Sequence, residues 1–425
     1  MARQTVPVTV LSGNLGAGKT TVLNNLLNTR TELDIAVLVN DMGEVNVDAE
    51  RVAEHSDISE DDEEMVELSD GCICCELRGD LLDALARLAQ AREFDYLVIE
   101  STGVAEPLPV AQTLTMGFDQ SDLDPTEFYE ETGIEVMDHY ELDTTVTVVD
   151  AHQFWRTFDS KESLMDGDTE KDLGSLLVEQ IEFCDVLLLN KCDLVDEATL
   201  EEIEGMLDVL QPRAEIIRTE HGAVDPDAIL DTGRFDFEAA SQSAGWMQEL
   251  EEPHASAEDE HGVTSFIFES RRPFHPERFA ELLDEFPANV VRSKGHFWLA
   301  GRSEIGLGLD VAGQSIRIVP AGRWIAALPE EEQAQYFDAS PELEANWHPT
   351  YGDRSSRLVL IGTEMDHDTV QSDFEAATLT AEEMDADWDA FEDRFPRFEE
   401  DPEAEQADDE PADDTDSAEE VGLAD

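Results

Sequence analysis

An eight-residue stretch near the N-terminus has the residue types and the spacing that hold phosphate groups. Residues 13–20 read Gly-Asn-Leu-Gly-Ala-Gly-Lys-Thr and match the pattern G-x-x-x-x-G-K-[ST]. The stretch follows an apolar run at residues 6–11 and opens a helical pattern over residues 20–27. Glycines let successive backbone N–H groups turn toward phosphate oxygens, and the helix N-terminus adds a favourable field. An ordinary glycine-rich turn requires neither the lysine nor the flanking elements, so we predict a phosphate-binding P-loop.

Two side chains of this loop and one distant acid are predicted to act on the phosphates. Lys19 is expected to reach the β- and γ-phosphates, and the Thr20 hydroxyl is expected to bind Mg²⁺. Glu100 ends the apolar run at residues 96–99, where an acid helps to hold Mg²⁺ directly or through water. Gly103, three residues later, would let the backbone approach the γ-phosphate. We therefore predict Lys19, Thr20 and Glu100 as catalytic residues, with Thr20 and Glu100 as magnesium ligands.

A further strand-like run, residues 35–39, is followed by Asn40-Asp41-Met42-Gly43-Glu44. In an open α/β sheet the carboxyl ends of the strands form the edge that binds the ligand. Asp41 is therefore predicted as a catalytic acid of a switch region, and Glu44 as a second switch acid and a candidate metal ligand. Two solvated loop acids in a very acidic chain are an equally good interpretation.

The tetrad Asn190-Lys191-Cys192-Asp193 follows the apolar run at residues 186–189. Its aspartate suits guanine, because a carboxylate accepts from N1–H and N2–H₂, a donor pair that adenine lacks. The lysine stem can lie along the base while the asparagine braces the loop, so the tetrad favours GTP over ATP. The residues predicted to contact the nucleotide are Gly13, Asn14, Gly16, Ala17, Gly18, Lys19, Thr20, Thr21, Gly103, Asn190, Lys191 and Asp193.

Three thiols lie within four residues, at Cys72, Cys74 and Cys75. Together they can present two or three sulfurs to a soft or borderline metal, with Zn²⁺ as the default and Cu(I) as an alternative. The local sequence supplies at most three ligands, so Glu44, a histidine or a client protein would complete the site. An open site suits the transfer of a metal better than permanent structure. Small buried cysteines and a redox pair are the competing interpretations, whereas Cys184 and Cys192 stand singly and are predicted to pack.

The elements that must position these residues alternate between strand and helix through the first 200 residues. Short β-branched runs at residues 6–11, 35–39, 96–99, 145–149 and 186–189 show little polar alternation, as strands buried on both faces should. Helical patterns lie between them, at residues 20–27 and 80–92. This order predicts an α/β domain with a doubly wound, mostly parallel sheet.

A second unit begins near residue 263. Candidate strands at residues 263–269, 289–299, 314–319 and 358–361 and helices at 276–285 and 368–377 predict a smaller α+β domain. Within it, the run Arg-Ser-Lys-Gly at residues 292–295 suggests either an anion or partner contact or a structural role. We predict a nucleotide-binding domain at residues 1–237, a linker at 238–262, the C-terminal domain at 263–398 and an acidic disordered tail at 399–425.

The charge of the chain restricts its partners and its environment. The 425 residues carry 102 acidic and 26 basic side chains, a net charge of −76, and residues 399–420 hold only 13 of the acids. Acidity spread over the whole surface, with only five lysines, is expected of a protein adapted to high salt. It argues against a nucleic-acid partner, and no apolar run is long enough for a membrane span. The odd number of cysteines and the absence of a signal peptide predict a reducing compartment, the cytoplasm.

The combination of a P-loop, Gly-Cys-Ile-Cys-Cys at residues 71–75, Glu-Ser-Thr-Gly at 100–103 and Asn-Lys-Cys-Asp at 190–193 resembles the CobW-type GTPases of the CobW/HypB/UreG class. Residues 292–300 and Tyr-Gly-Asp-Arg at 351–354 are similar to the C-terminal domain of that family. The resemblance implies a GTPase and metallochaperone in which Cys72, Cys74 and Cys75 bind zinc, with cobalt in some branches. Slow basal hydrolysis is expected, because no obvious catalytic arginine or glutamine stands in a recognisable position. GTP would tighten metal binding, and hydrolysis would release the metal to a client metalloprotein.

Other functions share these motifs. A cobalt-handling GTPase of cobalamin synthesis would have the same residues, and a nucleotide-dependent client-binding module would hold a structural metal that stays bound after hydrolysis. A small-molecule kinase is disfavoured by the Asn-Lys-x-Asp tetrad. A homo-oligomer is among the alternatives that the sequence leaves open.

Overall fold

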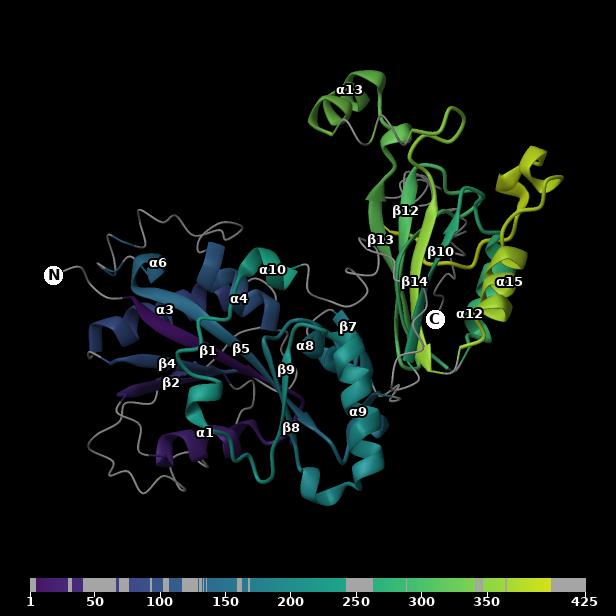
Figure 1. Ribbon diagram of the computed structural model, residues 1–425. Coiled ribbons are helices and arrows are strands. Elements are labelled where there is room, and N and C mark those ends of the chain that lie inside the picture. The colour runs from purple at the N-terminus through teal and green to yellow at the C-terminus, as the bar shows by residue number, and fades with distance from the viewer. Residues whose placement is uncertain are drawn as a thin grey trace, which may run out of the picture.

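The computed structural model describes two units, each built on its own β-sheet (Figure 1). The described residues are 5–29, 33–40, 66–68, 76–91, 94–101, 107–116, 136–158, 163–166, 169–241, 263–287, 289–340, 347–363 and 365–398, with the single positions 129, 132, 134 and 343. Among them, no helix has the length and the apolar character needed to cross a membrane.

The first sheet has seven strands in the order β3-β2-β4-β1-β5-β8-β9, and all of its pairings are parallel. A crossover therefore joins each strand to the next, which confirms the predicted α/β class with a mostly parallel sheet. In sheet order the strands are β3 (Val66–Leu68), β2 (Ile35–Asn40), β4 (Tyr96–Glu100), β1 (Val6–Ser12), β5 (Tyr140–Asp150), β8 (Val186–Asn190) and β9 (Glu215–Arg218).

Helices cover both faces of this sheet because its central strands are apolar on both sides. In β4, Leu97 and Ile99 pack in one core with Leu85 of α3 (Glu76–Ala91). Val98 points to the opposite face and shares a second core with Leu23 of α1 (Lys19–Asn28). The alternation of one strand between two cores is what a doubly wound domain requires. The other helices of this unit are α4 (Pro107–Met116), α6 (Val136–His139), α7 (Phe154–Phe158), α8 (Leu173–Glu182), α9 (Glu197–Leu210) and α10 (Phe237–Ser241).

The second sheet is antiparallel, with the strand order β10-β14-β11-β12-β13. One of its faces is covered by α12 (Pro276–Asp284) and α15 (His367–Ala377), where Phe279 and Phe374 join the core. Its strands are β10 (Val263–Ser270), β11 (Val290–Phe297), β12 (Ile305–Ala312), β13 (Ser315–Arg323) and β14 (Ser356–Thr363). Smaller elements are the hairpin of β6 (Ser163–Asp166) and β7 (Thr169–Asp172), and α13 (Glu330–Ala339).

One strand of the second sheet was not predicted from the sequence. β12 carries Gly306 and Gly308, which weaken a strand pattern. Both are places of close approach, since a Cβ atom at Gly308 would lie 2.8 Å from Val319 Cγ2 and one at Gly306 would lie 3.2 Å from the Trp324 ring. The bulky neighbours therefore fill the space that side chains of β12 would otherwise occupy.

The predicted linker and the predicted tail lie partly or wholly outside the described residues. Helix α10 runs to Ser241 and so enters the range predicted as a linker, whose remainder, residues 242–262, lies outside the described residues. The tail predicted at residues 399–425 lies outside them as well.

Candidate functional site

The loop between β1 and α1 has the backbone of a phosphate cradle. Gly13, Gly16 and Gly18 have φ angles of 137°, 79° and 111°, a region that side-chain-bearing residues rarely adopt. A Cβ atom at Gly13 would lie 2.3 Å from the Val148 carbonyl oxygen. At Gly16 nothing lies within 4 Å, so this side of the loop faces open space. Glycine is thus required at Gly13 by packing as well as by backbone conformation.

Lys19 lies over the loop that it is predicted to serve. Only 7% of the residue is exposed, and its Nζ donates to the carbonyl oxygens of Gly13 at 2.7 Å and Asn14 at 3.3 Å. Lys19 is also the first residue of α1, so the ammonium group and the N-terminal end of the helix lie at the same cradle. This arrangement can bind an anion of high charge density.

Thr20 and Glu100 meet at the carboxyl edge of the sheet. The Thr20 hydroxyl donates to Glu100 Oε1 at 3.0 Å, although 80 residues separate the two in sequence. Glu100 ends β4 and is 3% exposed. A hydroxyl and a carboxylate beside an anion cradle are hard oxygen donors of the kind that Mg²⁺ prefers. The pair therefore fits the predicted magnesium site.

Asn190 ties the P-loop to the loop after β8. Its side chain is buried, and Nδ2 donates to the Ala17 carbonyl oxygen at 2.9 Å. Oδ1 accepts from the Thr219 hydroxyl at 3.1 Å and from the Gly222 backbone N–H at 3.0 Å. Three segments are therefore fixed relative to one another by one amide.

Lys191 lies across the P-loop in a left-handed conformation, with φ of 64°. Its Nζ donates to the Gly16 carbonyl oxygen at 2.7 Å and pairs with Asp150 Oδ2 at 2.6 Å. Asp150 was not among the predicted site residues. Its signal was available, because it ends β5 in the same way that Glu100 ends β4.

Asp193 lies in the short 3₁₀ turn Cys192–Leu194 that follows Lys191. Its side chain is 29% exposed, and its Oδ2 is 3.9 Å from His221 Nε2. A carboxylate held here can accept two hydrogen bonds from a purine edge that enters from solvent.

A cavity of about 340 Å³ lies beside the P-loop. The P-loop residues Asn14, Leu15 and Gly16 form one of its walls, together with Asp150 and Lys191. Another wall comes from Gln153, which precedes α7, from Phe154, Arg156 and Thr157 of α7, and from Leu173 and Leu177 of α8. Sequence reasoning missed this wall, because no motif marks residues that reach the site only through helix packing.

Several predicted site residues lie outside the described part of the chain: Asp41, Glu44, Cys72, Cys74, Cys75 and Gly103. In the part that is described, no group of three or more His, Cys, Asp or Glu side chains could hold a metal ion. Cys184 is buried and its Sγ donates to the Ile181 carbonyl oxygen at 3.1 Å. Burial raises the pKa of the Cys184 thiol well above its usual range and also raises the pKa of Cys192, so neither thiol is prepared to ionise.

Comparison with known proteins assigns both units to one family. Residues 7–218 match the CobW/HypB/UreG nucleotide-binding domain, and residues 263–378 match the cobalamin synthesis protein cobW C-terminal domain. The chain is 40% identical over 398 residues to zinc-regulated GTPase metalloprotein activator 1 of Dictyostelium discoideum, covering 89% of this chain and 81% of that protein. It is 29% identical over 307 residues to the zinc chaperone YjiA of Escherichia coli, covering 70% of this chain and 83% of that protein. With its P-loop, Thr20–Glu100 pair and Asn-Lys-x-Asp loop gathered at one sheet edge, this chain belongs to the CobW/HypB/UreG family of nucleotide-binding proteins.

Proposed function

We propose that this protein is a GTP-binding and GTP-hydrolysing metallochaperone that carries zinc and passes it to a client metalloprotein. The observation that carries the proposal is the convergence of three sequence-distant elements on one site: the P-loop, the Thr20–Glu100 pair and the Asn190–Asp193 loop. The relatives named as a zinc-regulated GTPase activator and a zinc chaperone support the same function.

Each part of the site has a task in this proposal. The glycine-lined cradle and Lys19 bind the β- and γ-phosphates, and Thr20 and Glu100 would hold Mg²⁺, which would neutralise phosphate charge. Asp193 accepts from the guanine edge, and the Lys191 stem lies along the base. Water then attacks the γ-phosphate, the bond to the β-phosphate breaks, and GDP and phosphate leave. We expect slow hydrolysis, because the motifs at residues 13–20, 100–103 and 190–193 contain no arginine or glutamine that could act on the γ-phosphate.

The cargo is proposed to bind at Cys72, Cys74 and Cys75, with Glu44 as a candidate further ligand. Thiolates are soft ligands, and zinc accepts three of them with one position left open for transfer. Three adjacent thiols stay reduced in the cytoplasm, where we place the protein. The proposal has two alternatives. In one the cargo is cobalt, and in the other the metal is structural and stays bound after hydrolysis.

The first experiment measures nucleotide selectivity and metal binding on the reduced full chain in molar salt. We expect GTP to displace fluorescent GDP from the nucleotide site at far lower concentration than ATP does. We also expect the Cys74→Ser substitution to weaken zinc binding. Cys184→Ser is the matched control, because that thiol is buried and already donates to the Ile181 carbonyl oxygen, so its loss should leave zinc affinity unchanged. Equal competition by ATP, or full zinc affinity in the Cys74→Ser variant, would refute the proposal.

A further inference from the structure

Helix α8 belongs to the cores of both units. Val178 and Ile181 are fully buried in a cluster with Val291, Val359 and Ile361 of the second sheet. In Figure 1, α8 and α9 lie at the end of the first unit that faces this sheet. The face of the sheet opposite α12 and α15 is therefore occupied by the nucleotide-binding domain, and α8 is a main element of the contact.

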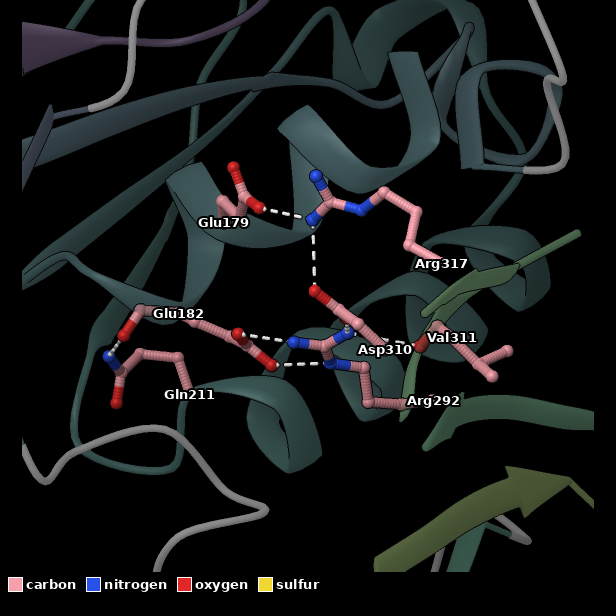
Figure 2. A network of polar contacts seen from close by, with 7 residues as sticks. All are labelled: Glu179, Glu182, Gln211, Arg292, Asp310, Val311 and Arg317. Carbon is pink, nitrogen blue, oxygen red and sulfur yellow. Dashed lines mark hydrogen bonds and ion pairs between the residues drawn. The ribbon is translucent and has the colours of Figure 1, made fainter. Parts of the chain in front are cut away.

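A buried arginine joins α8 to the second sheet (Figure 2). The Arg292 side chain, on β11, is 1% exposed. Its Nε and Nη2 donate to the two carboxylate oxygens of Glu182 at 2.7 and 2.8 Å, in the bidentate geometry that fixes direction as well as distance. Nη1 pairs with Asp310 and donates to the Val311 carbonyl oxygen at 3.0 Å. A guanidinium removed from water in this way is stable only while these partners remain.

A second arginine repeats the contact one turn earlier on the helix. Arg317 of β13 pairs with Glu179 at 2.7 Å and with Asp310 at 2.9 Å. Glu179 and Glu182 are three residues apart, so both carboxylates lie on one face of α8. Gln211, at the end of α9, donates to the Glu182 backbone carbonyl. Asp310 thus links two arginines that hold two glutamates of the same helix (Figure 2).

The same helix forms part of the cavity beside the P-loop. Leu173 and Leu177 line that cavity together with the P-loop residues Asn14, Leu15 and Gly16. Helix α7, which also lines the cavity, touches the second unit as well, since a Cβ atom at Gly313 would lie 2.1 Å from the Phe158 carbonyl oxygen. Both helices that line the cavity therefore also contact the C-terminal domain.

We propose that Arg292 is a positioning residue for the nucleotide site: by holding Glu182 it sets the place of α8, and so the C-terminal domain takes part in binding GTP. The inference rests on the proposed GTP-binding function. Arg292 is the first residue of the Arg-Ser-Lys-Gly run, and its anionic partner is Glu182 of the same chain, 110 residues earlier.

The test compares Arg292→Met with a matched variant, Arg302→Met, in the full-length protein. Arg302 is also buried, with a side chain 3% exposed, but it pairs with Asp393 at 2.7 Å and with the carbonyl oxygens of Phe395 and Pro396 inside its own domain. Both variants remove a buried arginine, and only one of them touches α8. The readouts are the Kd values for fluorescent GDP and for a non-hydrolysable GTP analogue, the KM and kcat of hydrolysis, and thermal unfolding.

We expect Arg292→Met to weaken nucleotide binding by about tenfold and to raise KM more than it lowers kcat. Arg302→Met should lower the unfolding temperature and leave both Kd values unchanged. Arg292→Lys, which keeps the charge but not the fork, should fall between wild type and Arg292→Met. If Arg292→Met does not fold, Arg317→Gln should show a smaller loss in the same direction.

Three results would overturn the inference. Equal nucleotide affinities for wild type and Arg292→Met would do so, and so would the same loss in Arg292→Met and Arg302→Met. Where Arg292→Met does not fold, unchanged affinity in Arg317→Gln would have the same meaning. A wild-type protein that binds neither GTP nor GDP would overturn the proposed function as well, which separates the two failures.

Discussion

Replacing Asn190 by alanine should loosen the P-loop and the guanine-side loop together. The residue is 2% exposed, and its amide makes three hydrogen bonds, one to the P-loop and two to the loop after β9. Alanine leaves the Ala17 carbonyl and the Gly222 N–H without these partners, in a place where water is largely excluded. A buried hydrogen bond contributes about 0.5–1.5 kcal/mol, and an orphaned partner adds to the loss. We therefore expect the free energy of unfolding to fall by about 3 kcal/mol.

Part of that loss should appear in nucleotide binding. The bond to the Ala17 carbonyl braces the phosphate cradle, and losing about 1.4 kcal/mol of preorganisation corresponds to a roughly tenfold weaker Kd. The assays are urea unfolding in molar salt and titration of fluorescent GDP.

Thr219→Val serves as the control, because it is nearly isosteric and removes only one of the three bonds. It should cost about 1 kcal/mol of stability and leave the Kd for GDP nearly unchanged. The reasoning is refuted if Asn190→Ala unfolds at the wild-type urea concentration and binds GDP with wild-type affinity.

Asp193→Asn should shift base preference from guanine to xanthine, because an amide donates to the xanthine 2-oxo group where the carboxylate accepted from the guanine amine. Competition between XDP and GDP measures the shift, and retained guanine preference would contradict the assignment. Burial raises the pKa of Asp310, but the neighbouring cations outweigh it and hold the pKa at about 2. Since this pKa lies below the unfolded value, the carboxylate's contribution of roughly 2 kcal/mol is complete above about pH 4 and is lost as the pH falls toward 2. Unfolding of wild type and Asp310→Asn between pH 6 and pH 2 tests this, and equal pH slopes would show the carboxylate to be uninvolved. Gly13→Ala should unfold at a lower temperature than Gly16→Ala, because its Cβ atom would meet the Val148 carbonyl at 2.3 Å whereas Gly16 faces open space; equal unfolding temperatures would contradict this.

The first sheet was predictable because its strands are buried on both faces and therefore read as continuous apolar runs. The runs at residues 6–11 and 186–189 correspond to β1 and β8 within one residue at each end. Strand β12 was not predictable in the same way, because side chains from other segments pack against Gly306 and Gly308. A local sequence pattern does not show which residues from other segments will lie beside a strand.

The candidate site likewise has parts that the sequence could predict and parts that it could not. The Thr20–Glu100 contact could be expected because Thr20 lies at the start of the helix that follows β1 and Glu100 ends β4, so both lie at the carboxyl edge of the sheet. The pairing of Lys191 with Asp150 could have been expected in the same way, because Asp150 ends β5 and Lys191 follows β8. The helical wall of the cavity depends on how α7 and α8 pack, which no motif encodes. The sequence alone could not identify the partner of Arg292, because Glu182 lies in the other domain.

The central claim is that nucleotide and metal communicate within one chain. It is tested most directly by the zinc affinity of the reduced protein in molar salt, measured first with GDP and then with a non-hydrolysable GTP analogue. A metallochaperone should bind zinc much more tightly with the GTP analogue, because its γ-phosphate orders the loops at the carboxyl edge of the sheet. Equal zinc affinity in the two states would contradict the account and would favour a structural metal.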